Sequence, residues 1–369
     1  MDNKQRIIDF CKELKLTKVG FVSCRPFEEL RPLLEERKAQ GTENPFEEKD
    51  IDKRLNPFIY MQEGKTIISI AFPYLHKAEL REDYGFSVYT RGYDYHRVVK
   101  GYLEKICAFI ESLGGKAVSF TDNNALPERY IAYLSGIGFI GKNNMLITHE
   151  YGSYVFLGEI ITDLELPEDC PDRSFEKMER YVECGEECTL CFDECPTKAI
   201  NSEKKNANIC LSFLTQKKDL EDKWLPHLSG RLFGCDSCQK KCRYNQLVRF
   251  SPLEEFKPHK HMEDHDILEL KNLDKKTFKE KYLITSCGWR GKAVLQRNAL
   301  IRSALFDKED IKTFTSSSEY LMDYKERLLR IKESGILERL EKQKSKRKPV
   351  STCAIQPLEK TTDEEGLVL

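Results

Sequence analysis

The stretch CGEECTLCFDECP, residues 184–196, decides how this chain is interpreted. It holds Cys184, Cys188, Cys191 and Cys195, and Pro196 follows the last of them directly. In this kind of spacing, three thiolates bind one four-iron cluster and the cysteine before proline reaches a second cluster. The stretch therefore predicts iron–sulfur ligation, although three residues rather than two separate the first two cysteines.

A second group of four cysteines follows, made of Cys210 and the run CDSCQKKC at 235–242. Each four-iron cluster takes four thiolates, so eight cysteines within 59 residues fit two clusters without remainder. By analogy with the crossed ligation of two-cluster ferredoxins, we assign four cysteines to each cluster. One set is Cys184, Cys188, Cys191 and Cys242, and the other is Cys195, Cys210, Cys235 and Cys238. Arg243 stands where proline commonly follows the last cysteine.

A zinc ribbon is the alternative use of these cysteines. It would take only the two C-x-x-C pairs, Cys188/Cys191 and Cys235/Cys238. This alternative leaves four clustered cysteines and the Cys195-Pro196 pair unexplained. The six scattered cysteines are interpreted as buried or incidental thiols: Cys11, Cys24, Cys107, Cys170, Cys287 and Cys353.

The composition is that of an ordinary globular protein. Of 369 residues, 40% are hydrophobic and 33% are charged, and the net charge is -1 at pH 7. Residues 1–16 carry charge every few positions and indicate an amphipathic helix rather than an export signal. No run approaches the roughly 18 apolar residues that span a bilayer. We therefore expect a cytoplasmic protein without a membrane partner, whose cysteines bind metal instead of forming disulfides.

The remaining sequence divides into regions of different pattern. Helical periodicity at 2–15, 95–113 and 128–135 alternates with β-rich runs at 19–23, 66–72, 116–120, 144–149 and 154–161. This alternation predicts an α+β or α/β domain. Helical patterns return at 275–283, 292–305 and 317–342. The predicted units are 1–170, 171–250, 251–345 and a polar tail at 346–369.

Seven segments, in chain order, carry a family resemblance. They are RLNP at 54–57, YTRGYDYHRVVKGYLEKI at 89–106, FTDNNALPERYIAYLSGIGFIGKNNMLI at 120–147, the cysteine run at 184–196, CLSFLT at 210–215, LFGCDSCQKKC at 232–242 and LQRNALI at 295–301. Together they resemble the epoxyqueuosine reductase family, which is related to corrinoid reductive dehalogenases. The resemblance runs from about residue 5 to residue 305.

The resemblance implies a three-part enzyme. An N-terminal α/β domain would bind cobalamin, a ferredoxin-like module would hold two [4Fe-4S] clusters, and a C-terminal helical repeat-like region would contact a tRNA anticodon stem-loop. The substrate would be epoxyqueuosine at the wobble position, and the product queuosine. Asp122 matches the family's proton donor. The positions that match its cobalamin contacts are Arg54, Arg91, His96, Asp122, Gly141, Asn143, Ser212, Cys235 and Asp236.

The residues taken alone leave alternatives open. An aspartate after a strand is more often a helix cap or turn residue, and His96 can equally be structural. The run GIGFIGKNN at 136–144 lacks the spacing of a phosphate-binding loop, and we expect a tight turn that approaches the cofactor closely. A general acid must be protonated when it acts, so we expect desolvation to raise the pKa of Asp122.

Partners are predicted from local charge. Residues 200–260 hold twelve Lys/Arg against seven Asp/Glu, and residues 325–348 hold ten against four. Such regions can contact phosphates, but a solvated helix face explains 325–348 equally well. Two other functions stay open: a corrinoid iron–sulfur reductase of a small molecule, and an electron-transfer protein of ferredoxin type. We expect a monomer that takes electrons from an unidentified donor.

Overall fold

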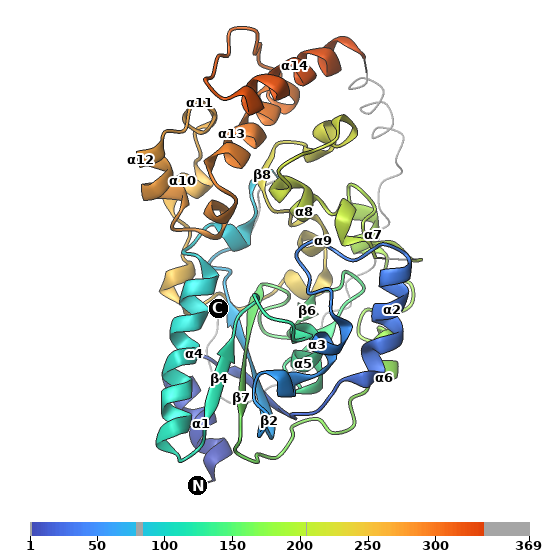
Figure 1. Ribbon diagram of the computed structural model, residues 1–369, viewed down its shortest axis with the longest axis vertical. Helices are drawn as coiled ribbons and strands as arrows, with labels where there is room; N and C mark the ends of the chain where they lie inside the picture. The colour runs from blue at the N-terminus through green and yellow to red at the C-terminus, as the bar shows by residue number, and fades with distance from the viewer. Residues whose placement is uncertain (1, 79–83, 204, 336–369) are drawn as a thin grey trace.

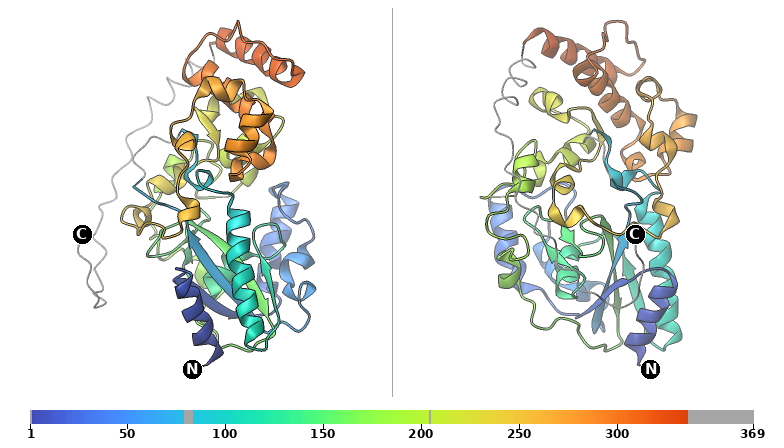
Figure 2. Two further views of the ribbon diagram at one scale, coloured as in Figure 1. Left: turned by 90° about the vertical axis from the view of Figure 1, so that its left-hand side faces the viewer. Right: turned by 180° about the vertical axis from the view of Figure 1, so that it is seen from behind.

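The computed structural model describes residues 2–78, 84–203 and 205–335 (Figure 1). A sheet with its covering helices forms one end of the molecule, and the C-terminal helices form the other end. The cysteine-rich segment lies between and beside them, as the views in Figure 2 also show. The amino terminus lies at the sheet end, far from α14 (Glu319–Glu333).

The central sheet has four strands in the order β1-β2-β7-β4. Their bounds are β1 Lys18–Ser23, β2 Thr66–Pro73, β7 Val155–Thr162 and β4 Ala117–Phe120. All three strand pairs are antiparallel. The α/β alternative is therefore wrong for this sheet, because it requires parallel strands, and the α+β description holds. Every residue of β2 is buried, as expected for a β-branched run in the middle of a sheet.

Helices cover both faces of this sheet. On one face, α1 (Asn3–Glu13) and α4 (Tyr95–Ser112) bury their apolar stripes. In α4 the buried residues Val99, Leu103, Ile106 and Ile110 recur at helical spacing, which places them on one side of the helix. On the other face lie α2 (Arg31–Ala39), α3 (Ile51–Leu55) and α5 (Glu128–Leu134).

The cysteine-rich segment contains only short regular elements. They are α6 (Phe175–Glu179), α7 (Leu190–Glu194), α8 (Leu211–Gln216), β8 (Arg231–Phe233) and α9 (Ser237–Lys240). Strand β8 pairs in parallel with β3 (Gly85–Phe86), and β5 (Phe139–Ile140) pairs with β6 (Leu146–Ile147). The segment is thus joined to the N-terminal part by a short two-stranded sheet.

The C-terminal helices pack against the cysteine-rich segment. They are α10 (Lys260–Glu263), α11 (Ile267–Lys271), α12 (Lys275–Thr277), α13 (Lys292–Ile301) and α14. Arg297 of α13 is completely buried and donates to the carbonyl oxygens of Thr215, Lys217 and Lys218 at 3.1, 2.7 and 2.9 Å. The amide of Asn298 donates to Thr215 O at 2.8 Å and to Leu232 O at 2.7 Å. The pair Arg297-Asn298 therefore satisfies the carbonyls at the end of α8, which explains the LQRNALI motif.

Most sequence-predicted elements are present, and some of them differ in extent. The strand expected at 144–149 is reduced to β6, and the helix expected at 275–283 is α12 followed by a π-helical turn at Phe278–Tyr282. The helix expected at 317–342 is observed as α14, and its predicted end, like the tail at 346–369 and Cys353, lies outside the described residues. In the described part of the chain, no helix combines the length and apolar character needed to cross a membrane.

Candidate functional site

Asp122 lies on a turn immediately after the sheet. Strand β4 ends at Phe120, and Asp122 adopts a left-handed backbone conformation with φ of 56°. Few residues other than glycine tolerate this region, and aspartate is one of them. Its side chain is 54% exposed. The turn therefore presents a carboxyl group to the outside, which is a different role from the helix cap that the sequence left open.

Two side chains from the start of α4 hold this carboxyl group. Tyr95 Oη donates to Oδ2 of Asp122 at 2.5 Å, and Nε2 of His96 lies 3.1 Å from the same oxygen. Nδ1 of His96 lies 2.8 Å from Oδ1 of Asp94, whose other role is to cap α4 through the backbone N–H of His96. The imidazole of His96 is thus placed between two carboxylates, which favours protonation of both ring nitrogens.

This arrangement moves the proton from the aspartate to the histidine. Burial alone would lower the pKa of His96, but hydrogen bonds to Asp122 and Asp94 raise it to about 9. Burial alone would raise the pKa of Asp122, but hydrogen bonds from His96 and Tyr95 outweigh burial and lower it. The expectation of a raised pKa for Asp122 is therefore wrong for this structure. At neutral pH the pair is a carboxylate and an imidazolium.

The first set of cysteines lies together. The described cysteines are all free thiols. Burial and then the neighbouring thiols of Cys184, Cys188 and Cys242 raise the pKa of Cys191 to about 12. Cys184 and Cys188 likewise raise the pKa of Cys242, after burial. These four thiols therefore lie near one another, and the assignment of each cysteine to one cluster stays a prediction.

The second set lies together in the same way. Burial raises the pKa of Cys238 well above its usual range, and Cys235, Cys210, Cys191 and Cys195 add to this effect. Cys195 also raises the pKa of Cys210. Within the described ranges, no three His, Cys, Asp or Glu side chains form a site for a single metal ion.

The G-K-N turn between β5 and β6 holds the first cysteine loop. Nζ of Lys142 donates to the carbonyl oxygens of Gly185, Glu186 and Cys188 at 2.8, 2.8 and 3.1 Å. The backbone N–H of Lys142 points at Sγ of Cys184, at 3.4 Å. A lysine with these partners is a clamp on the loop and not a phosphate ligand. This N–H contact also supports Cys184 as a ligand, since amide groups commonly donate to cluster sulfurs.

The predicted cobalamin contacts Gly141 and Asn143 belong to the same turn. A Cβ on Gly141 would lie 2.6 Å from Cδ1 of Ile147, so a larger residue at this position would require the Ile147 side chain to shift. The Asn143 amide donates to the carbonyl of Cys238 at 3.4 Å. The turn therefore touches both cysteine sets.

The other predicted cobalamin contacts have hydrogen-bond partners within the protein. The hydroxyl of Ser212 hydrogen-bonds with Tyr89, Cys235 Sγ lies 3.4 Å from the Ser237 hydroxyl, and Arg54 donates to Glu47 at 3.0 Å. Asp236 is 2% exposed and accepts from Ser87 Oγ and, at 2.9 Å, from the backbone N–H of Val88. The carboxylate of Asp236 is therefore directed at the β3 region of the protein.

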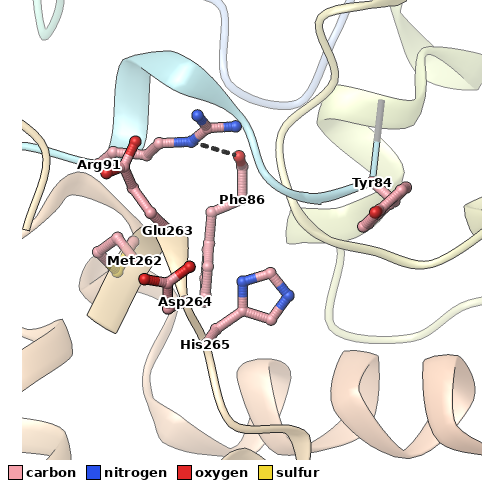
Figure 3. Close-up of a pocket in the computed structure, with 7 residues that line it drawn as sticks. All are labelled: Tyr84, Phe86, Arg91, Met262, Glu263, Asp264 and His265. Carbon is pink, nitrogen blue, oxygen red and sulfur yellow. Dashed lines mark hydrogen bonds between the residues drawn. The ribbon is translucent and has the colours of Figure 1, made fainter. Parts of the chain in front are cut away.

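Arg91 lies beside a cavity whose lining does not include Asp122. Its Nε donates to the carbonyl of Phe86 at 3.0 Å. Its side chain lines a cavity of about 310 Å³ with Tyr84, Phe86, Met262, Glu263, Asp264 and His265 (Figure 3). The structure thus brings Asp122 together with His96, and Gly141 and Asn143 together with the cysteines. Arg91 lines a cavity that contains none of these residues.

Four residues of the site had no role predicted from the sequence. Tyr95 stands beside His96 in Y-D-Y-H, and Lys142 stands in the G-K-N motif, so both were within recognised motifs without an assigned role. Glu128 is the second-to-last residue of the DNNALPER segment. Glu159 interrupts the apolar run VFLGEII. A charged residue in the middle of a buried strand is itself a signal, because an unpaired buried charge is costly.

Comparisons with known proteins identify the family. The model of epoxyqueuosine reductase QueG, DUF1730, matches residues 54–123, and the 4Fe-4S double cluster binding domain matches residues 183–245. An epoxyqueuosine reductase of Bacillus anthracis is 38% identical over 314 residues, covering 82% of this chain and 80% of that protein.

Two solved structures agree with this assignment. One is an epoxyqueuosine reductase with an epoxyqueuosine-modified tRNA-Tyr stem loop, with a TM-score of 0.80, 32% identity and coverage of 94% of this chain and 95% of the other. The second is the Bacillus subtilis epoxyqueuosine reductase with its catalytic aspartate loop swung out of the active site, with a TM-score of 0.78, 31% identity and the same coverage. The chain, an oxidoreductase of mixed helix and sheet with a 4Fe-4S double cluster domain, belongs to the epoxyqueuosine reductase family.

Proposed function

We propose that this chain reduces epoxyqueuosine to queuosine at the wobble position of tRNA, using cobalamin and two [4Fe-4S] clusters. The observation that carries the proposal is the exposed carboxyl group of Asp122, held at the end of the sheet by Tyr95 and His96. A relative of similar fold has been solved with an epoxyqueuosine-modified tRNA stem loop. Another has a catalytic aspartate loop, and Asp122 lies on a loop of this chain.

The chemistry defines what the protein must provide. Converting an epoxide to an alkene removes one oxygen as water and consumes two electrons and two protons. When bound, cobalamin and the clusters supply the two electrons. The side chains of this protein must then place an acid beside the departing oxygen, which contributes roughly two to four powers of ten in rate.

Asp122 and His96 together can act as that acid. The raised pKa of His96 and the lowered pKa of Asp122 favour His96 as the holder of the proton at neutral pH. A substrate that covers Asp122 removes water from its half-exposed carboxyl group, and desolvation favours the neutral acid. The proton then moves along the 3.1 Å contact from Nε2 of His96 to Asp122, and from there to the substrate oxygen. Tyr95 keeps the carboxyl group oriented through its hydrogen bond.

The cysteines fit two four-iron clusters. Soft thiolates are the ligands such clusters need, and the eight neighbouring thiols suffice for four ligands to each cluster. The proposed sets are Cys184, Cys188, Cys191, Cys242 and Cys195, Cys210, Cys235, Cys238.

The cobalamin proposal has narrower support from the side chains. A corrin carries amide side chains and a phosphate, which suit hydrogen-bonding residues. Asn143 and Ser212 lie beside the cysteine sets. Arg54 reaches the same region indirectly: its partner is Glu47, and the preceding residue, Phe46, packs against Phe213. We therefore propose Arg54, Gly141, Asn143 and Ser212 as contacts, with His96 and Asp122 on the substrate side. Arg91 and Asp236 would contribute only through their backbone.

The tRNA would meet exposed basic residues of the cysteine-rich segment. Lys218, Lys241 and Arg249 are exposed within residues 200–260. In α14, by contrast, Arg327 pairs with Asp222 at 2.5 Å, and Lys325 and Lys332 donate to backbone carbonyls at 2.6 and 2.7 Å. These contacts favour a structural role for the basic face of α14, so we place the phosphate contacts on residues 200–260.

The proposal assigns one role to each predicted unit. Residues 1–170 would bind cobalamin and carry the acid, residues 171–250 would hold the clusters in a ferredoxin-like fold, and residues 251–345 would support them and flank the tRNA. The protein would act in the cytoplasm as a monomer and take electrons from a donor that its sequence does not identify.

Anaerobic reconstitution tests the proposal directly. The loaded protein should contain about eight irons and one cobalt and should convert epoxyqueuosine to queuosine in tRNA. Full metal content without conversion of any tRNA would instead favour a corrinoid reductase of a small molecule. Eight irons without cobalt would favour an electron-transfer protein.

A further inference from the structure

A buried carboxyl group lies beneath the Asp122 turn. Glu159 is the charged residue in β7, and its side chain is 0% exposed. In the sheet it stands opposite Ser69 of β2 and Phe120 of β4, the residue that precedes the turn. The Ser69 hydroxyl donates to Oε1 of Glu159 at 3.2 Å. Glu159 thus lies at the end of the sheet from which the Asp122 turn emerges.

A second carboxyl group ties this residue to the turn. Glu128 is the first residue of α5, which packs on β2 and β7. Its Oε1 accepts from the backbone N–H of Asp122 at 2.9 Å and from the Asn124 amide at 2.7 Å. Its carboxyl group is also hydrogen-bonded to that of Glu159. Glu128 is therefore the link between the exposed acid and the buried one.

The contact between Glu128 and Glu159 requires a proton. Two ionised carboxylates can only accept hydrogen bonds. Among the described residues, no N–H or O–H group donates to Oε2 of Glu159. Two ionised carboxylates in contact inside the protein would repel each other strongly. The hydrogen bond and the burial of Glu159 are both explained if the two groups share one proton.

Burial and the neighbouring carboxylates raise the pKa values of both glutamates. Burial, followed by the charge of Glu128, raises the pKa of Glu159 well above its usual range. Burial, followed by the charge of Asp122, raises the pKa of Glu128 to about 7. Arg129 and the hydrogen bonds from Asn124 and Ser69 oppose these effects without cancelling them.

We propose that Glu128 and Glu159 store one proton and supply it to Asp122 during turnover. This inference rests on the proposed function, because reduction of one epoxide consumes two protons and the Asp122–His96 pair holds only one. After the first proton reaches the departing oxygen, the stored proton moves from the Glu128–Glu159 pair to the Asp122 carboxylate and then completes the water molecule. His96 and the pair are then both refilled from solvent. Both glutamates act through Asp122 and are therefore positioning residues.

Infrared spectroscopy of the full-length, cluster-loaded protein tests the shared proton without turnover. Between about pH 5 and about pH 9, the wild type should show a protonated-carboxyl band, because ordinary carboxylates are ionised over this range. The band should be lost only at higher pH, because the pKa of Glu159 lies well above its usual range. Glu128→Gln and Glu159→Gln should each remove it. Glu255→Gln is the matched control, since this partly buried carboxylate accepts from Tyr102 Oη at 3.1 Å and lies outside the pair.

Ser69→Ala provides a variant that keeps both carboxyl groups. The Ser69 hydroxyl stabilises the ionised form of Glu159, so its loss should move the midpoint of the band to higher pH. Absence of the band in the wild type, or its persistence in both Gln variants, would overturn the shared proton. The same holds if Ser69→Ala leaves the midpoint unchanged.

Steady-state kinetics test the supply to Asp122. In both Gln variants kcat for epoxyqueuosine in tRNA should fall about tenfold or more, with KM unchanged, as expected for a lost proton-transfer step. The wild-type kcat should decline as pH rises through about 7, where Glu128 ionises, and this decline should be absent from Glu128→Gln. Wild-type kcat and pH profile in both variants would refute the supply. If the wild type itself reduced no epoxyqueuosine, the proposed function and the supply would both fail, and the infrared spectra would still decide on the shared proton.

Discussion

The two ends of the proposed reaction centre are built by different means. Asp122 is placed by regular structure: a strand leads to it, α5 follows it, and the first turn of α4 supplies its partners Tyr95 and His96. The cysteines lie on short helices and loops, and the longest α-helix in this segment, α8, has six residues. Side-chain clamps such as Lys142 and Arg297 hold these loops from outside.

This difference indicates how each end gains its stability. The sheet buries two clusters of apolar side chains and can be stable before any cofactor binds. The cysteine-rich segment brings thiols together against their mutual repulsion when ionised, which metal ligation relieves. We therefore expect damage in the two regions to have separable effects on chemistry and on assembly.

Loss of a cluster ligand should have the largest effect. Cys195→Ser or Cys238→Ser replaces a soft thiolate with a poor ligand for iron. Each variant should lose the signal of one cluster and essentially all epoxide reduction, while the far-ultraviolet circular dichroism of the sheet region persists. Iron analysis and electron paramagnetic resonance measure the first result. Full iron content and unchanged spectra in both variants would refute the crossed assignment.

Loss of the acid should affect chemistry alone. Asp122→Asn keeps the size of the side chain and can still accept from Tyr95, but it cannot donate a carboxylic proton. Turnover should fall by a factor on the order of a hundred or more, with clusters and cobalamin retained. Rates are measured at full occupancy of both cofactors. Lost cobalamin binding would instead make Asp122 a cofactor contact, and near-normal turnover would exclude it as the acid.

Lys142 connects the two regions and should show an intermediate effect. Lys142→Met removes three charge-assisted hydrogen bonds to the loop of Cys184 and Cys188. We expect this loop to lose about 1.5 to 3 kcal/mol of stability, which shortens the lifetime of the adjoining cluster. The measurement is the rate of iron release to a chelator. Lys177→Met is the control, since Lys177 donates to the Asp172 carbonyl at 2.7 Å, outside the cysteine loops. Equal iron release in both variants would contradict the clamp.

The two regions also differ in how much their sequences predicted. In the sheet region, local patterns gave the elements: α4 follows from its apolar spacing, and β2 from its β-branched run. The antiparallel strand order did not follow, because pairing between β2 and β7 joins residues about ninety positions apart and is decided by tertiary packing. The contact of His96 with Asp122 was missed for the same reason, and with it the direction of the pKa shift.

In the cysteine-rich segment the opposite holds. The spacing of the cysteines predicted a double cluster domain, which the family match at residues 183–245 confirms, because a cluster constrains the spacing of its ligands. The assignment of each cysteine to one cluster stays a prediction. Neighbouring polar residues were less predictable. Asp236 matched a cofactor-binding motif, yet its carboxylate accepts from Ser87 and Val88, which lie about 150 positions earlier. Motifs specify which residues recur, whereas the direction of a side chain depends on partners that only the fold brings near.

The smallest expected effect is the pH dependence of stability contributed by His96. Its pKa is raised from 6.5 to about 9 in the folded protein, so the folded state binds this proton more tightly than the unfolded state does. The contribution is fully present below about pH 6.5 and is lost as pH rises towards about 9. Because solvent reaches both partners, we expect only about 1 kcal/mol. Urea unfolding of the wild type and of His96→Gln at both ends of this range measures it. The wild type should lose more stability than the variant on going to high pH. Equal losses would show that the Asp94–His96–Asp122 contacts do not hold the proton in the folded protein, and the acid would then have to be Asp122 alone.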